Sequence, residues 1–197
     1  MKVIGITGGV GSGKTQVLEY LNDKYGATIC RTDEVARSMQ KKGGEVYDAI
    51  VEHFGEEILD EKGEIDRPKL GSIVFTDAEE LAVLNSLVHP AVKAEVKKEI
   101  MKEERKNTNL FLLESALLIE DDYEEICDEI WYIHVDADIR KKRLMYARGY
   151  SEKRVDNIIS SQMKKKEYMM NCDRVIDNSG LFSETTMQLD SIIKDLK

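Results

Sequence analysis

Gly8-Gly9-Val10-Gly11-Ser12-Gly13-Lys14-Thr15 is the stretch of this 197-residue chain that decides its fold. It fits the pattern G-x-x-x-x-G-K-[ST], in which glycines let the backbone wrap around an anion so that successive N–H groups point at phosphate oxygens. In this pattern the lysine reaches the β- and γ-phosphates of a nucleoside triphosphate, and the following hydroxyl ligates Mg²⁺. We therefore expect a triphosphate to bind at residues 9–16, with Lys14 on its phosphates and Thr15 on the metal.

The residues on either side of this loop have the patterns of a strand and a helix. Residues 3–7 form an apolar run that leads directly into the loop, and Val17, Leu18 and Leu21 share one helical face after it. The positive end of that helix dipole would favour a bound anion. A glycine-rich turn that binds nothing is the alternative, and the strand and helix around the loop disfavour it.

Five short runs along the chain have the composition of buried strands. They alternate with helical stretches and are mostly apolar on both faces, which indicates a parallel sheet covered by helices. The sequence therefore predicts an α/β fold with a five-stranded parallel sheet. The five runs are residues 2–7, 27–31, 110–114, 129–136 and 174–177.

The helical stretches between these runs suggest how one domain over residues 1–197 is organised. More helix lies between the second and third strands than a simple crossover needs, so we place a helical substrate-binding insertion at residues 35–106. Within it, Thr76 and Glu79 have the spacing of a capping box that starts a helix, and Pro90 would break or kink that helix. A second, basic helical stretch at residues 138–170 would form a lid, which leaves residues 1–34, 107–137 and 171–197 as the core.

Charge and hydropathy limit the partners of this protein. The chain has 29 Lys+Arg against 38 Asp+Glu, a formal charge of −9, which disfavours nucleic-acid binding because that affinity comes largely from cationic contacts. No run approaches the ~20 apolar residues of a membrane span, and the N-terminus lacks the pattern of a signal peptide. We expect a cytoplasmic protein that binds neither nucleic acid nor membrane.

The other motifs favour a small phosphotransferase among triphosphate-binding proteins. The chain has no Asn-Lys-x-Asp segment of the kind that reads guanine, and its D-x-x-G segment at residues 177–180 comes too late for a γ-phosphate switch. A phosphotransferase needs a carboxylate near the acceptor hydroxyl. Asp33 follows the second predicted strand, whose carboxyl end would open on the same side as the phosphate loop. Asp33 could equally be a helix N-cap, and its position alone does not separate the two roles.

Cations that neutralise the transferred group are expected in the predicted lid. Arg140-Lys141-Lys142-Arg143 would place Arg140 and Arg143 on one helical face, with Arg148 further along. A run of charges is often only a solvated face. Beside a phosphate loop, a cationic helix that closes over ATP and excludes water is the better interpretation.

Six blocks in order along the chain resemble the dephospho-CoA kinase family. The resemblance implies the P-loop kinase fold and transfer of the ATP γ-phosphoryl group to the ribose 3′-hydroxyl of dephospho-CoA, with ATP and Mg²⁺ as cofactors. The blocks are residues 5–15, 33–37, 65–75, 84–92, 117–120 and 175–180.

This resemblance implies roles for several further residues. Asp33 would be the base or the residue that orients the hydroxyl, beside Lys14 and Arg140 as the other catalytic groups. Asn178 and Gly180 would lie near the adenine of ATP. The acceptor side would be formed by Asp33, Arg37, Asp66, Arg67, His89 and Pro90. For His89 a purely local hydrogen bond is the alternative.

The chain departs from the family pattern at several positions. Arg31 stands where the family often has an acidic residue, Ala116 replaces a usual proline, and Ala147 occupies a usual arginine position of the lid. Gln16 replaces a frequent threonine, although its backbone N–H can still reach the α-phosphate. Glu114 stands where a carboxylate could hold Mg²⁺ through water.

Two other functions are compatible with these motifs. One is a kinase for a different small acceptor, such as a nucleoside monophosphate, on the same scaffold. The other is a binding or scaffold protein in which ATP only sets the conformation; the presence of Asp33 and of a basic lid argues against it.

Overall fold

A five-stranded parallel sheet organises the first of the two units into which the computed structural model divides the chain. This unit comprises Met1–Ile29 and Glu103–Lys197, and the second comprises Cys30–Lys102. The structure describes residues 1–196. None of the helices within that range has the length and apolar character needed to cross a bilayer.

The strand order of the sheet is β2-β3-β1-β4-β5, so β1, which leads into the glycine-rich loop, lies at its centre. The prediction of a parallel sheet is confirmed, and three strands have the predicted bounds. β2 begins one residue later than predicted because Ala27 still belongs to the turn after the preceding helix, where its N–H donates to the Leu21 carbonyl. β4 ends two residues earlier because Asp136 is the N-cap of the next helix. The strands are β1 (Lys2–Thr7), β2 (Thr28–Arg31), β3 (Leu110–Glu114), β4 (Glu129–His134) and β5 (Arg174–Asp177).

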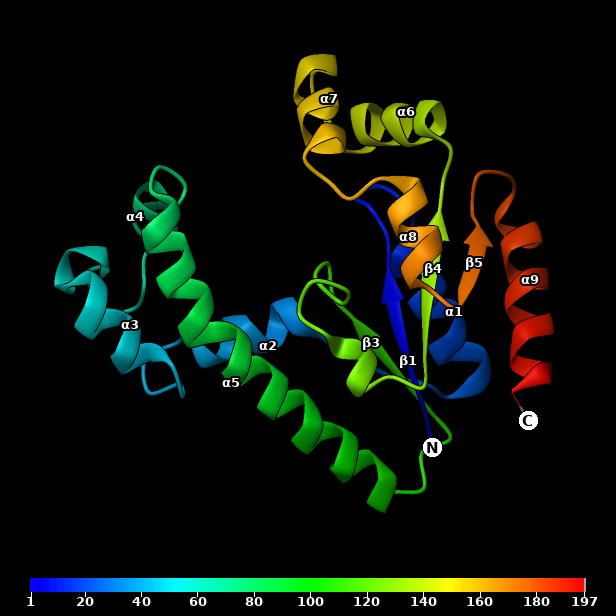
Figure 1. Cartoon of the computed structure of the whole chain (residues 1–197), viewed down its shortest axis with the longest axis horizontal. Helices are drawn as coiled ribbons and strands as arrows, with labels where there is room; N and C mark the ends of the chain where they lie inside the picture. Colours follow the sequence, from blue (N-terminus) through cyan, green and yellow to red (C-terminus); the bar gives the residue numbers. More distant parts are fainter. Residues whose placement is uncertain (197) are drawn as a thin grey trace. The chain divides into compact units, whose positions relative to one another are not determined.

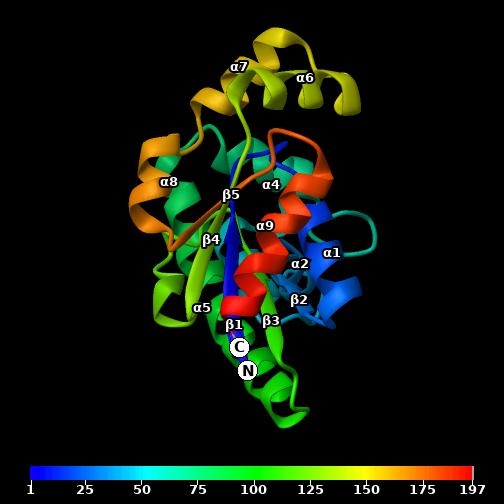
Figure 2. The same cartoon turned by 90° about the vertical axis from the view of Figure 1, so that its right-hand side faces the viewer.

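Helices cover both faces of the sheet in this first unit. Helices α1 (Lys14–Tyr25) and α9 (Phe182–Asp195) lie on one face and α8 (Lys165–Asn171) on the other, as Figures 1 and 2 show. Aliphatic side chains of β1, β3 and β4 pack against Leu18 and Leu21 of α1 and Leu189 of α9, all of which are fully buried. Burial of each such side chain contributes about 1.5–3 kcal/mol. The core therefore fixes where β1 ends and α1 begins.

Asp190 of α9 joins this helix to α1. Its carboxylate accepts hydrogen bonds from the hydroxyls of Tyr20 and Tyr25, both at 2.6 Å, and from Lys24 Nζ at 2.7 Å. These hydrogen bonds, of which that from Lys24 has the largest effect, lower the pKa of Asp190 to about 2. The two helices on this face are thus held by a charge-assisted contact as well as by the core.

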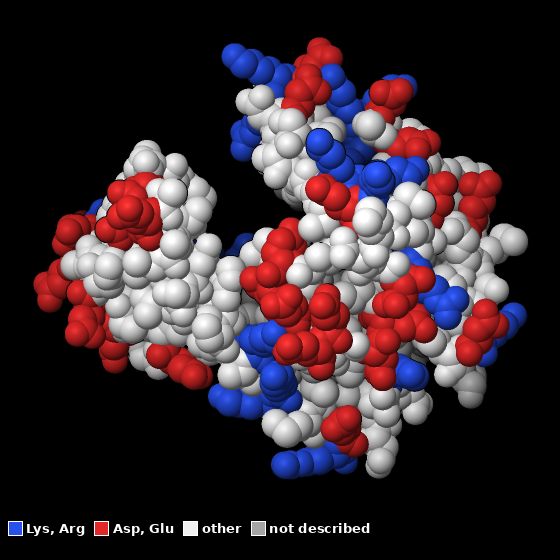
Figure 3. All heavy atoms as spheres, in the orientation of Figure 1, with Lys and Arg blue, Asp and Glu red and all other residues white. Residues whose placement is uncertain are grey.

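The predicted lid, residues 138–170, contains α6 (Ala137–Arg148), α7 (Glu152–Ser160) and most of α8. Because α8 packs on β4, we call only α6 and α7 the lid. Lys141 of α6 pairs with two carboxylates of α7, at 2.7 Å from Glu152 and 2.8 Å from Asp156. Acidic and basic side chains are interspersed over these helices in Figure 3. Part of the basic run at residues 140–143 therefore serves to join α6 to α7.

The second unit is helical, with a short 3₁₀ turn at Glu56–Ile58. Asp77 caps α5, because its Oδ1 accepts from the N–H groups of Glu79 and Glu80. The predicted cap at Thr76 is wrong by one residue: the Thr76 hydroxyl donates back to carbonyls of the preceding helix. Helix α5 continues without a break through Pro90. The helices are α2 (Thr32–Met39), α3 (Tyr47–Phe54), α4 (Arg67–Val74) and α5 (Ala78–Arg105).

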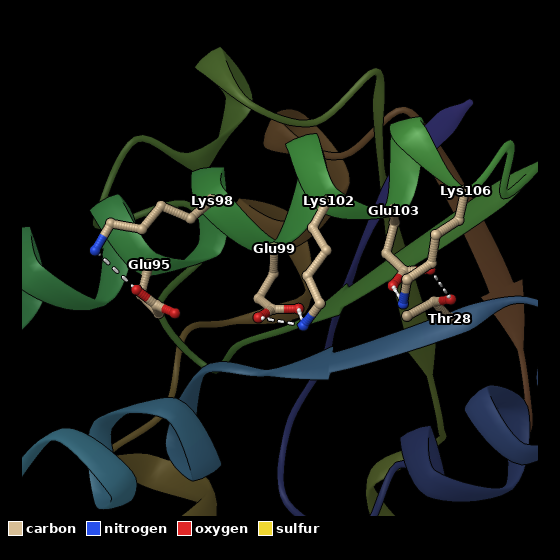
Figure 4. A network of polar contacts seen from close by, with 7 residues as sticks. All are labelled: Thr28, Glu95, Lys98, Glu99, Lys102, Glu103 and Lys106. Atoms are coloured by element: carbon tan, nitrogen blue, oxygen red, sulfur yellow. Dashed lines mark hydrogen bonds and ion pairs between the residues drawn. The ribbon is translucent and has the colours of Figure 1, made fainter.

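Glu–Lys pairs follow one side of the last turns of α5, as Figure 4 shows. Glu95 and Lys98 are 2.9 Å apart, Glu99 and Lys102 3.0 Å. The third pair differs because Glu103 is buried. Its carboxylate accepts from Lys106 at 2.6 Å, from the Thr108 hydroxyl at 2.8 Å and from the Thr28 hydroxyl at 2.9 Å. These contacts, that of Lys106 first, lower the pKa of Glu103 to about 2.

We predict that Glu103→Gln destabilises the fold in a pH-dependent way. A carboxyl whose pKa falls from 4.5 to about 2 on folding stabilises the protein above pH 4.5 and loses that contribution as the pH falls toward 2. The variant should therefore unfold about 2–4 °C below wild type at pH 7, with a smaller difference at pH 3. Calorimetry at both values measures this, with Glu99→Gln, which removes a partly exposed Glu–Lys pair of the same helix, as the control. An equal difference at both pH values would contradict the prediction.

Candidate active site

The phosphate-binding loop joins β1 to α1, and three of its glycines have backbone conformations that favour glycine. The φ angles of Gly8, Gly11 and Gly13 are 145°, 84° and 87°, and Gly13 is the left-handed N-cap of α1. Lys14 opens the helix and its Nζ donates to the Gly8 carbonyl at 2.7 Å. The loop thus curls over its own lysine, with the N-terminus of α1 directly after it, as the sequence predicts.

Asn178 supports the loop from the connection between β5 and α9. Its Nδ2 donates to the Ser12 carbonyl at 2.8 Å, and its Oδ1 accepts from the Thr185 hydroxyl at 2.9 Å. A side chain at Gly13 would meet Asn178 Nδ2 at 2.3 Å, so a glycine is needed there for space as well as for conformation. Asn178 is buried and both ends of its amide have protein partners. Its contact with adenine, and that of Gly180 two residues later, stay predictions.

Arg140, in the first turn of α6, lies directly on the loop. Its Nε donates to the Val10 carbonyl at 2.7 Å, and a Cβ at Gly9 would lie 2.3–2.6 Å from the guanidinium. No carboxylate of residues 1–196 forms an ion pair with it, and burial lowers the pKa of Arg140. A half-buried cation whose acceptors are neutral oxygens is suited to bind an anion that the protein does not itself supply.

Gln162 also contacts the loop, and the sequence patterns did not point to it. It lies in the turn between α7 and α8, and its Oε1 accepts from the Val10 N–H at 3.2 Å. The same oxygen accepts from Nη2 of Arg140. In the sequence, Gln162 is only a polar residue in a turn between two helices of the basic stretch. Many glutamines without a role in a site have the same setting.

Three buried polar atoms near these elements have no hydrogen-bond partner among the described residues. They are the hydroxyl oxygens of Thr7 and Ser12, which belong to the end of β1 and the loop, and Nη1 of Arg143 on α6. Most buried polar groups are satisfied, so unsatisfied ones need an explanation such as a ligand or water. Both the loop and the lid therefore retain donor capacity for a bound molecule. The side chain of Arg148 lies outside the described part of the chain.

The pocket at the base of the lid is the second cationic feature of this unit. It has a volume of about 390 Å³, and its walls include Arg140, Gln162, His134 and Lys165. Lys165 Nζ lies 2.9 Å from Nε2 of the buried His134. Neither His134 nor Lys165 was among the predicted site residues, because their proximity arises only when α8 packs on β4.

The oxygen groups predicted to hold Mg²⁺ flank the loop. Glu114 ends β3 beside Ile6 of β1, two residues before Gly8, and Thr15 is in the first turn of α1 with an exposed side chain. Among the described residues, no three His, Cys, Asp or Glu side chains form a cage for a metal. A hydroxyl and one carboxylate fit Mg²⁺, which binds through few protein oxygens and completes its shell with phosphates and water.

The second unit contains the predicted acceptor residues. Asp33 is exposed in the first turn of α2, where Arg31 is the N-cap, so the alternative role of Asp33 as N-cap is wrong. Arg37 follows one turn later on the same helix. Arg37 and Arg67 line one pocket of about 280 Å³, together with Gln40, Lys41, Glu64 and Ile65. Three cations against one carboxylate make this pocket suitable for an anionic ligand.

The remaining acceptor residues lie at two other points of this unit. Asp66 is the N-cap of α4 and accepts from the Lys69 N–H at 3.1 Å. It therefore positions Arg67, the first residue of that helix. His89 is half-buried and Pro90 exposed on α5. The structure thus brings Arg37 and Arg67 together, while a role for His89 and Pro90 stays a prediction.

Comparison with known proteins identifies the family of this chain. The family model for dephospho-CoA kinase matches residues 2–184. The chain is similar to the dephospho-CoA kinase of Streptococcus mutans, at 36% identity over 100% of this chain and 98% of that protein. It is also similar to the dephospho-CoA kinase of Carboxydothermus hydrogenoformans, at 38% identity over 100% and 95% of the two chains.

A solved structure extends this likeness to three dimensions. The structure of TT1252 from Thermus thermophilus superposes with a TM-score of 0.82 at 27% identity, covering 100% of this chain and 98% of that one. The family match includes the phosphate loop, Asp33, both cationic pockets and the lid. On the sequence match, the fold and this site, the chain belongs to the dephospho-CoA kinase family.

Proposed function

We propose that this protein transfers the γ-phosphoryl group of ATP to the ribose 3′-hydroxyl of dephospho-CoA, giving coenzyme A and ADP. The observation that carries the proposal is the phosphate loop, on which Arg140 lies without a carboxylate partner among the described residues, in a chain that matches the family over residues 2–184. The pocket of Arg37, Lys41 and Arg67 supports an acceptor that, like dephospho-CoA, carries a diphosphate.

On the ATP side, the loop would hold the β- and γ-phosphates through backbone N–H groups and Lys14. Arg140 would offset negative charge on the transferred group, and Arg143 has a buried Nη1 that no described residue uses. Asn178 holds the loop at the Ser12 carbonyl, so the backbone donors of the loop would be in place before ATP binds. Such preorganised electrostatic stabilisation supplies most of the catalysis in phosphoryl transfer.

Magnesium would be held by the Thr15 hydroxyl and, through water, by the Glu114 carboxylate. Bound there, Mg²⁺ would supply positive charge that offsets the negative charge developing on the transferred phosphoryl group. Thr15 is exposed at the start of α1, immediately after the lysine that contacts the same phosphates. Glu114 contributes negative charge beside the loop, which would favour a cation there.

On the acceptor side, Asp33 would orient the 3′-hydroxyl and accept its proton. It precedes Arg37 by four residues on α2, so both side chains lie on the same side of the helix. Arg37 and Arg67 would bind the diphosphate of dephospho-CoA in their pocket. The acceptor would then be fixed by its charged group, with its hydroxyl directed by the carboxylate.

The test of this function is ATP consumption by the purified protein with Mg²⁺, in the presence and absence of dephospho-CoA. We expect acceptor-dependent ADP formation and a product heavier by one phosphate, located at the 3′ position by mass spectrometry and NMR. A panel of nucleoside monophosphates tests the rival acceptors. Binding of ATP without modification of dephospho-CoA would overturn the proposal.

We predict that Asp33→Ala abolishes turnover while leaving ATP binding largely intact. Removal of a group that positions or deprotonates the hydroxyl should lower kcat by about 10²–10⁴-fold. Steady-state kinetics together with titration of a fluorescent ATP analogue separate the two effects. Glu34→Ala, the neighbouring exposed carboxylate on α2, is the matched control. Near-normal turnover in Asp33→Ala would remove this residue from the mechanism.

We predict that Arg67→Met raises the KM for dephospho-CoA by at least about tenfold and leaves the KM for ATP unchanged. The reason is the loss of a charge-assisted contact to the acceptor, which is worth about 1.5–3 kcal/mol. Initial rates at varied concentrations of each substrate measure both constants. Lys62→Met removes a cation from the same unit outside the pocket and should behave as wild type. An increase in the ATP KM alone would contradict this role.

A further inference from the structure

We propose that Gln162 is a positioning residue for phosphoryl transfer, which holds Arg140 and the Val10 peptide in place on the phosphate loop. The inference rests on the proposed role of Arg140 toward the phosphates. It adds a residue that neither the loop motif nor the basic run contains.

The contacts form a closed ring of three partners. Val10 donates its N–H to Gln162 Oε1 at 3.2 Å and accepts on its carbonyl from Arg140 Nε at 2.7 Å. Arg140 Nη2 completes the ring by donating to the same Oε1. One residue of the loop is thus bound at both its N–H and its carbonyl, which belong to successive peptide groups, and the guanidinium is held at two of its nitrogens.

The chemistry of the amide explains why a glutamine suits this position. A carboxylate here would also accept both hydrogen bonds, but it would form an ion pair with Arg140 and cancel the charge that the phosphates need. A neutral amide oxygen orients the guanidinium and leaves its full charge for the ligand. The half-buried setting, in which burial lowers the pKa of Arg140, strengthens this electrostatic effect.

The position of Gln162 in the chain links this ring to the lid. Arg140 lies at the start of α6 and Gln162 lies just beyond the end of α7, so the two residues frame the α6–α7 pair. Leu144 of α6 adds an apolar contact, because a Cβ at Gly11 would lie 2.9 Å from Leu144 Cγ. The lid is therefore anchored to the loop at both of its ends, and displacement of either end would move Arg140 or release Val10.

The decisive experiment measures kcat and both KM values for Gln162→Met, Gln162→Glu, Arg140→Met and the double variant Arg140→Met/Gln162→Met. Gln162→Met keeps the side-chain length without the acceptor oxygen. We expect its kcat to fall about 10–100-fold while the KM for ATP changes less than about threefold, because misplacement of a charge-compensating group affects the transition state more than ground-state binding. Gln162→Glu should lose at least as much kcat, although it keeps the acceptor.

The double variant and a control separate positioning from a structural role. If Gln162 acts through Arg140, the double variant should be no slower than Arg140→Met alone. Ser161→Ala, in the same turn with an exposed hydroxyl bonded only locally to the Ile158 carbonyl, should behave as wild type. Thermal unfolding checks that each variant is folded, and if Gln162→Met is not, Gln162→Glu decides.

Two results would overturn the inference. One is a kcat within twofold of wild type in both Gln162 variants while Arg140→Met is slow. The other is a double variant whose loss equals the product of the two single losses. Wild-type kcat in Arg140→Met would instead refute the proposed role of Arg140, a failure that can be recognised separately.

Discussion

A phosphate loop must present backbone N–H groups to its ligand, and in this structure side chains that bind the loop's carbonyl groups hold the loop in shape. The carbonyls of Gly8, Val10 and Ser12 accept from Lys14, Arg140 and Asn178, respectively. Alternate residues of the loop are thus held by side chains from α1, from α6 and from the connection after β5. Peptides whose carbonyls are held in this way direct the intervening N–H groups toward an anion. The core of β1, α1 and α9 fixes the two ends of the loop.

The same constraint shows how an acidic protein can bind a triphosphate. The chain has a formal charge of −9, yet no carboxylate of the described residues pairs with Arg140, which lies on the loop. Lys141 and Arg140 are neighbours in the sequence with opposite environments. Lys141 is paired with Glu152 and Asp156, while Arg140 contacts only neutral oxygens of the described residues. The net charge of a chain therefore does not predict whether it binds phosphate at a buried site. Whether a cation there can bind phosphate depends on the groups with which it is already paired.

The sequence predicted what depends on local pattern. The spacing of residues 8–15 and the five apolar runs sufficed for the sheet, the loop and its attachment to α1, because short-range geometry determines them. The cap of α5 was misplaced by one residue because Asp77 and Thr76 are both good caps, and only the hydrogen bonding of the preceding helix separates them. Gln162 could not be predicted, since it meets Val10 across 152 residues and Arg140 across 22. Its contacts depend on how α6 and α7 pack, which places the turn after α7 beside the loop.

The Thr28–Glu103 hydrogen bond has a consequence for the modularity of the chain. The chain leaves the first unit after Ile29 and returns to it at Glu103. The 2.9 Å hydrogen bond from Thr28 to Glu103 joins these two points. When the ends of an insertion lie side by side, its length can vary with little effect on the stability of the host unit. The reason is that the entropic cost of closing a loop rises only slowly with loop length. The residues from the end of β2 to Lys102 could thus be remodelled over evolutionary time, or exchanged by design, while the nucleotide-binding scaffold keeps its own core. The buried carboxylate of Glu103 thus holds together the two points between which a different helical segment could be inserted.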